Sequence, residues 1–129
     1  MSSAHYPEHP ASVAKARAFV ASSLGEAPDE LRDRAVLITS ELATNAILHA
    51  RSDFTITATI TDGELQVAVT DSGGVRFPLP RQPVHDEPHG RGLLIADSLA
   101  DQWGIDSQPY ATTVWFTLAM PSMSQPPGM

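Results

Sequence analysis

The chain has no cysteine, few basic residues and no long apolar run, and each of these absences excludes a class of protein. Without cysteine among the 129 residues there is no disulfide, no thiol chemistry and no thiolate metal site. Acidic residues outnumber basic ones 15 to 8, for a net charge of −7, and no basic stripe typical of nucleic-acid binding is present. No apolar run approaches the roughly 18 residues needed to cross a bilayer.

The amino terminus also lacks the basic and apolar segments of a secretory signal peptide. We therefore expect a cytoplasmic protein that contacts neither nucleic acid nor a membrane. The negative charge does not exclude a nucleotide ligand, because a divalent cation and backbone N–H groups can offset the repulsion between the protein and phosphate.

What the sequence does contain is enough apolar residues for one folded domain. The hydrophobic fraction is 42%, which is too high for global disorder, and the length fits a single domain. We expect this domain to span residues 10–119, with flexible tails at 1–9 and 120–129. A short edge strand near His5-Tyr6 is an open alternative for part of the first tail.

Two helices are predicted in the first half of the chain. Apolar residues recur every three to four positions over residues 11–24, and Gly25 follows as a helix-ending residue. A second helix begins at Pro28-Asp29-Glu30, where proline and acids suit a first turn, and continues to about Ala50. The side of this helix that faces the core is predicted to carry Leu31, Ala35, Ile38, Leu42 and Ala46, with His49 as a further candidate.

The second half of the chain reads mainly as strands. Residues 54–60 alternate and are rich in β-branched side chains, Asp62-Gly63 is a hairpin turn signal, and residues 65–70 form the partner strand. A long proline-rich loop is predicted at 72–90 and a helix at 92–101. A closing pair of strands is predicted at 103–107 and 112–118. Helices segregated beside such a sheet indicate an α+β fold in two layers.

The second predicted helix carries a polar pair, Glu41 and Asn45, at the edge of its apolar side. Residues four apart lie on one helix face, about 5–6 Å apart at their Cβ atoms. The amide oxygen of Asn45 can ligate a hard cation, and the carboxylate of Glu41 can position or deprotonate a nucleophile. Taken alone, the pair is more typical of a solvated helix face than of a site.

Two glycine-containing motifs follow. Asp71 comes directly after a strand and can accept a hydrogen bond from an exocyclic amine such as that of adenine, while Gly73 lets a ligand approach the backbone. Gly90-Arg91-Gly92-Leu93 opens a helix, where backbone N–H groups and an arginine can bind phosphate. A surface turn and a plain loop-to-helix junction are the alternatives for these motifs.

Taken in order, the three motifs resemble the N, G1 and G2 boxes of the GHKL ATPases, which include gyrase, Hsp90, histidine kinases and MutL. The small size and the segment from Trp103-Gly104 to Trp115 resemble the anti-sigma factor serine kinases in particular. The resemblance implies the Bergerat fold, a two-layer α/β sandwich with helices on one face of a mixed, mostly antiparallel sheet.

The resemblance also implies a role for each motif residue, with ATP and Mg²⁺ as cofactors. Asn45 would ligate the Mg²⁺ that bridges the phosphates, and Glu41 would be the general base acting on an incoming hydroxyl. Asp71 would recognise the adenine amine, with Gly73 giving the ring room. The residues implied at the phosphates are Gly90, Arg91, Gly92 and Leu93.

The function implied is that of a protein serine/threonine kinase that phosphorylates a STAS-type anti-sigma antagonist. In that family the kinase also sequesters a sigma factor, regulates transcription by partner switching without DNA contact, and forms a homodimer. An alternative is a non-catalytic ATP-binding module whose nucleotide state gates a protein interaction. Val75 favours this alternative, because the family usually has a glycine at that place in its first glycine box.

Overall fold

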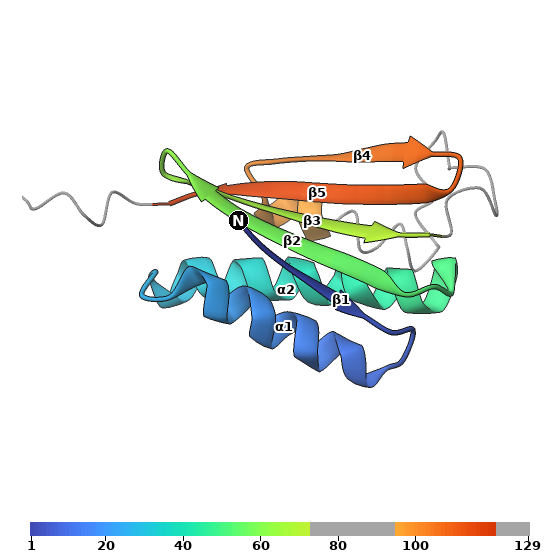
Figure 1. Cartoon of the computed structure of the whole chain (residues 1–129). Coiled ribbons are helices and arrows are strands. Elements are labelled where there is room, and N and C mark those ends of the chain that lie inside the picture. Colours follow the sequence, from blue (N-terminus) through green and yellow to red (C-terminus); the bar gives the residue numbers. More distant parts are fainter. Residues whose placement is uncertain (73–94, 121–129) are drawn as a thin grey trace, which may run out of the picture.

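The computed structural model describes residues 1–72 and 95–120, and these form a sheet with helices packed against one face (Figure 1). In chain order the elements are β1 (Ser2–Tyr6), α1 (Ala11–Leu24), α2 (Asp29–Asn45), the π-helical turn η1 (Ala46–Ala50), β2 (Phe54–Thr61), β3 (Glu64–Asp71), β4 (Gln102–Gln108) and β5 (Ala111–Ala119). The five-stranded sheet has the order β1-β2-β3-β5-β4. The predicted α+β class is confirmed, and the strand pairings within the described residues are all antiparallel.

The amino-terminal residues form a strand and not the flexible tail expected for residues 1–9. Strand β1 runs antiparallel to β2, from Ser2 opposite Ala58 to Tyr6 opposite Phe54. The Tyr6 ring packs against the core with its centroid 5.7 Å from that of Phe54, and burial raises the pKa of its hydroxyl above the ordinary value. The strand covers an edge of β2 that would otherwise present unpaired backbone groups. Residues 121–129 of the other expected tail lie outside the described residues.

Helices α1 and α2 begin and end close to the predicted positions. At the start of α1 the Ser12 hydroxyl donates to the Pro7 carbonyl at 2.7 Å, and Gly25 follows the last residue of α1 with a φ of 56° that suits glycine. Helix α2 carries Asp29 and Glu30 in its first turn, where their negative charges interact favourably with the positive end of the helix dipole. None of the described helices is long and apolar enough to cross a membrane.

The predicted second helix reaches Ala50, but its last turn is wider than an α-helix. Residues Ala46–Ala50 form the π-helical turn η1, and the chain then reverses at Arg51, which has left-handed backbone angles. Such wide turns are rare and occur often beside functional sites. Here the wide turn directly follows Asn45, so it sets how the chain leaves the end of α2.

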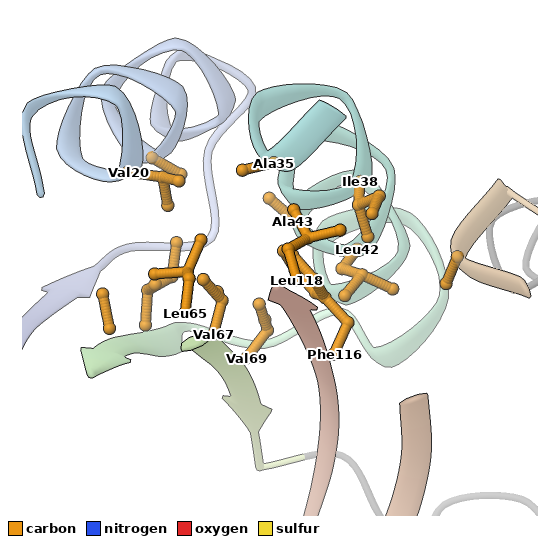
Figure 2. Close-up of a cluster of buried hydrophobic side chains, with 14 of the residues drawn as sticks. Val20, Ala35, Ile38, Leu42, Ala43, Leu65, Val67, Val69, Phe116 and Leu118 are labelled. Atoms are coloured by element: carbon orange, nitrogen blue, oxygen red, sulfur yellow. The ribbon is translucent and has the colours of Figure 1, made fainter. Parts of the chain in front are cut away.

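The core lies between the helices and the sheet. Figure 2 shows side chains from α1, α2, β3 and β5 directed toward one another across this layer. The residues predicted for the apolar side of the second helix are buried in α2 and at Ala46 of η1, whereas the further candidate His49 is half-buried. The core residues labelled in the figure are Val20, Ala35, Ile38, Leu42, Ala43, Leu65, Val67, Val69, Phe116 and Leu118.

The hairpin between β2 and β3 has the predicted turn. Asp62 and Gly63 both have positive φ, 52° and 75°, as a type I′ turn requires. The Gly63 carbonyl accepts a hydrogen bond from the Met120 amide at 2.7 Å, so the turn is tied to the end of β5.

The sheet face away from α1 and α2 is largely polar. Alternate residues of β2 place Thr55, Thr57 and Thr59 on it, opposite the buried positions of the same strand. Trp115 of β5 covers Gly104 of β4 so closely that a Cβ atom at Gly104 would lie 2.7 Å from Cζ2 of the indole. Only glycine fits beneath this ring without a shift of the tryptophan.

We predict that Gly104→Ala lowers the free energy of unfolding by about 1–3 kcal/mol, the usual cost of forcing an extra methyl group into a packed contact. Urea denaturation measures the change. In a Trp115→Leu background the cost of the same substitution should shrink, because the ring that opposes the methyl group is gone. Equal costs in the two backgrounds would contradict the packing argument.

A second stability prediction concerns Thr39, which is fully buried on α2. In the part of the chain that the structure describes, its hydroxyl has no hydrogen-bond partner. Thr39→Val should therefore raise the free energy of unfolding by about 1 kcal/mol, since it removes a buried polar group without changing the shape. Ser12→Ala is the matched control and should lower stability, because the Ser12 hydroxyl is hydrogen-bonded. A loss of stability in Thr39→Val would show that the hydroxyl has a partner in solution.

Candidate functional site

Glu41 and Asn45 lie on α2 at the border between its buried and solvent-facing sides. Both side chains are half-buried, and each is followed by a buried apolar residue, Leu42 or Ala46. Because the apolar side is held against the sheet, the two polar side chains keep a fixed direction relative to it. Their separation of four residues places them on one helix face.

Asp71 is the last residue of β3. It lies opposite Phe54 on β2 and opposite Thr112 on β5, which makes it the final rung of both ladders. Side chains alternate along a strand, so Asp71 shares the face of the buried Val69, and this is the face that the helices cover. Its side chain is half-buried and therefore directed toward the helix layer at the end of the sheet.

A chain of hydrogen bonds joins the end of α2 to the end of β3. The Ser52 amide donates to the Ala46 carbonyl at 3.3 Å, one residue after Asn45. The Ser52 hydroxyl accepts a hydrogen bond from the Ser72 amide at 3.1 Å, one residue after Asp71. The segments that carry the carboxamide and the carboxylate are thereby brought to the same end of the molecule.

Residues 95–101, which follow the second glycine motif, are fastened to three elements. Residues 95–99 are helical, and the Leu99 carbonyl accepts a hydrogen bond from Arg34 Nη2 of α2 at 2.8 Å. Trp103 Nε1 of β4 donates to Asp97 at 3.0 Å. The Asp101 carboxylate accepts from the Ala119 amide of β5 at 2.6 Å. This segment therefore has a fixed position beside α2.

The remaining predicted site residues cannot be placed. Gly73, Gly90, Arg91, Gly92 and Leu93 lie outside the described residues, as does Val75. Among residues 1–72 and 95–120 there is no cluster of three or more histidine, aspartate or glutamate side chains that could hold a metal ion. One carboxamide oxygen still suits Mg²⁺ bound with a nucleotide, because Mg²⁺ there takes most of its ligands from phosphates and water.

Three residues that contact the site or the segment 95–101 were not predicted from the sequence: Ser52, Thr112 and Arg34. Ser52 follows a helix end and carries no motif, so only the fold reveals its contact with Ser72. Thr112 could have been placed beside Asp71 only with the register of β3 and β5 known. Arg34 looks like an ordinary surface cation until residues 95–99 are placed against α2.

The sequence comparison decides the family. Residues 6–118 match the family described as "Histidine kinase-like ATPase domain". The chain belongs to this family. The ATPase family implies ATP as the ligand of the domain and a kinase-type activity in general terms. No curated protein sequence matches the chain.

Solved structures with the same fold include domains of two larger bacterial proteins. One is a structure of the RsbU and RsbW domains of Rv1364c from Mycobacterium tuberculosis, with 19% identity and a TM-score of 0.71 over 93% of this chain and 33% of that chain. The other is the histidine kinase domain of the blue-light activated histidine kinase EL346 from Erythrobacter litoralis, with 21% identity and a TM-score of 0.60 over 88% of this chain and 61% of that chain. At these identities the likeness establishes the fold.

We predict that Arg34→Met loosens residues 95–101. Methionine keeps the apolar stem of the arginine side chain but lacks the guanidinium that donates to the Leu99 carbonyl. The next residue, Ala100, donates its amide to the Ala96 carbonyl, and this amide should exchange its hydrogen roughly three- to tenfold faster. Hydrogen exchange followed by NMR measures the rate.

Arg32→Met is the matched control for this experiment. The Arg32 guanidinium also binds backbone carbonyls, but those of Gly25 and Ala27 in the connection between α1 and α2. It should leave exchange at Ala100 unchanged. Equal effects of the two substitutions would mean that residues 95–101 respond to overall stability and not to Arg34.

Proposed function

We propose that the protein binds Mg²⁺-ATP where the end of α2 meets the end of β3, and that it phosphorylates a serine or threonine of a protein partner. The observation that carries this proposal is the link through Ser52, which joins the segment after Asn45 to the segment after Asp71. Membership of an ATPase family supports the ligand, and the half-buried Glu41 on the same helix face supports a base beside it.

Each residue has a proposed role. Asp71 would accept a hydrogen bond from the adenine amine, with Gly73 making room for the ring. Asn45 would hold the Mg²⁺, and the motif from Gly90 to Leu93 would contact the phosphates through N–H groups and Arg91. When bound, Mg²⁺ would neutralise charge on the phosphates. This neutralisation matters here because the protein itself is acidic and repels phosphate.

Glu41 would act on the acceptor. A serine or threonine hydroxyl of the partner would approach the γ-phosphorus in line with the bond to the β-phosphate. The new oxygen–phosphorus bond forms as that bond breaks and ADP departs, while the hydroxyl proton passes to the Glu41 carboxylate. Most of the rate enhancement would come from positioning and charge neutralisation.

The proposed partner is a STAS-domain anti-sigma antagonist, with a sigma factor bound in exchange and a homodimer as the working unit. The fold likeness to a structure that contains an RsbW domain supports this choice. Such a protein would regulate transcription in the cytoplasm through protein contacts, and its net charge of −7 suits a regulator that makes no contact with DNA.

A second candidate is a non-catalytic module whose nucleotide state gates a protein interaction. Val75 favours it, since this residue stands where the resembled family usually has a glycine. The two candidates share the ATP site and differ only in the transfer step. They are separated by a substitution that removes the base and leaves the ligand contacts in place.

The nucleotide site is tested by calorimetric titration of ATP with and without Mg²⁺. Asn45→Ala should abolish the Mg²⁺-dependent part of binding, and Asp71→Asn should weaken binding by roughly tenfold or more, because it removes a charge-assisted hydrogen bond. Gln66→Ala and Asp106→Asn are matched controls that remove an exposed carboxamide and carboxylate from β3 and β4. Wild-type protein that does not bind ATP would refute the proposal.

The transfer step is tested by incubating the protein with ATP and purified STAS-domain proteins and following phosphate incorporation. Glu41→Gln should lower the rate at least about 100-fold while ATP affinity stays near the wild-type value, since general base catalysis contributes 10²–10⁴-fold. Phosphorylation that survives in Glu41→Gln would remove Glu41 from the mechanism. ATP binding without transfer to any acceptor would favour the non-catalytic module.

A further inference from the structure

We propose that Ser52 is a positioning residue for the adenine end of the nucleotide site. This inference rests on the proposed ATP site and names a residue that no motif of the chain contains. Ser52 lies in the short connection between η1 and β2, and its side chain is almost entirely buried. We propose no contact between Ser52 and the ligand. Ser52 acts by holding the backbone of Ser72, the residue after Asp71.

The strand ladder explains why a positioning residue is needed there. Asp71 is the last residue of β3 with partners on both sides, Phe54 of β2 and Thr112 of β5. The ladder therefore does not extend to Ser72, and the backbone that leaves Asp71 has no strand to hold it. The Ser52 hydroxyl takes over this task by accepting the Ser72 N–H at 3.1 Å.

Ser52 is itself held from two directions. Its hydroxyl donates to the Asp53 carbonyl at 2.7 Å, and its amide donates to the Ala46 carbonyl at 3.3 Å. The single hydroxyl proton is thus committed to Asp53, so the oxygen presents lone pairs to Ser72. A hydroxyl group can donate and accept at once. Alanine has no such group, and the thiol of cysteine is only a weak donor and a weak acceptor.

The geometry couples two parts of the site that come from distant stretches of sequence. On one side Ser52 follows the π-helical turn that begins after Asn45, and on the other it fixes the residue after Asp71. Loss of the hydroxyl frees the backbone at Ser72, so the Asp71 carboxylate is less well oriented before the ligand arrives. Recognition of the adenine should suffer, whereas the contribution of Mg²⁺ at Asn45 should not.

The experiment compares ATP and adenosine affinities of wild-type protein, Ser52→Ala and Ser52→Thr by calorimetry, with thermal unfolding measured alongside. Ser52→Ala should bind both ligands roughly three- to tenfold more weakly, the loss expected for one hydrogen bond. The ratio of ATP affinities with and without Mg²⁺ should stay at the wild-type value. Ser52→Thr keeps the hydroxyl and should restore binding of both ligands.

Ser12→Ala is the control for a merely structural effect. It also removes one buried hydroxyl that is hydrogen-bonded to a backbone carbonyl, but at the start of α1. It should lower the melting temperature as Ser52→Ala does and leave both affinities unchanged. Ser52→Cys provides a milder substitution, for which the affinity should lie between those of wild-type protein and Ser52→Ala.

The outcomes separate this inference from the proposed function. If wild-type protein binds ATP and Ser52→Ala binds it equally well, Ser52 is a structural residue only and the inference fails while the ATP site stands. Equal losses of affinity in Ser52→Ala and Ser12→Ala would overturn it in the same way. If wild-type protein binds no ATP, the proposed function fails and the inference falls with it.

Discussion

The burial of one side of α2 against the sheet is the constraint on which the rest of the structure depends. Leu31, Ile38 and Leu42 each remove most of their apolar surface from water, worth roughly 1.5–3 kcal/mol per side chain. Rotating the helix by one residue would expose these side chains. The half-buried Glu41 and Asn45 therefore have no freedom to turn away from the end of the sheet.

The sheet supplies the opposite half of the arrangement. Its alternation directs Asp71 toward the helix layer for the same reason that it buries Val67 and Val69, which are four and two residues earlier on β3. Asp71 thus continues the buried side of β3 by one more position, and Asn45 is the last residue of α2.

Hydrogen bonds between side chains and the backbone then hold the chain near the two glycine motifs. Ser72 is held by Ser52 after the first motif begins, and Leu99 is held by Arg34 after the second motif ends. Arg34 belongs to α2, and Ser52 lies in the connection between η1 and β2. Helix α2 therefore carries the proposed metal ligand and base and also, through Arg34, holds the segment that follows the proposed phosphate contacts.

The sequence predicted the elements that rest on repeated local signals. Helices α1 and α2 have several turns of apolar periodicity, and the β2–β3 hairpin combines alternation with an Asp62-Gly63 turn. Strand β1 was expected only as an alternative, because five residues with two half-buried apolar side chains carry little signal. Its position is decided by the free edge of β2, a property of the assembled sheet.

The residues of the candidate site likewise fall into those that a local sequence pattern marks and those that only the assembled fold reveals. Glu41, Asn45 and Asp71 stand at positions that local patterns mark, at the edge of an apolar helix side and at the end of a strand. Ser52 and Arg34 act through contacts with residues 20 and 65 positions away, and no local pattern encodes such distances. The π-helical turn is also unmarked, since residues 46–50 continue the apolar periodicity of α2.

The most direct test of the central claim is to map the bound nucleotide by NMR. Amide resonances of the assigned protein are followed during titration with Mg²⁺ and a non-hydrolysable ATP analogue. With the nucleotide bound where α2 and β3 end, shifts among the described residues should concentrate at Asn45, Ser52, Asp71 and Ser72, with none on the outer face of β2 and β3 at Thr57 and Gln66. Shifts confined to α1 or to that outer face would place the ligand elsewhere and contradict the account.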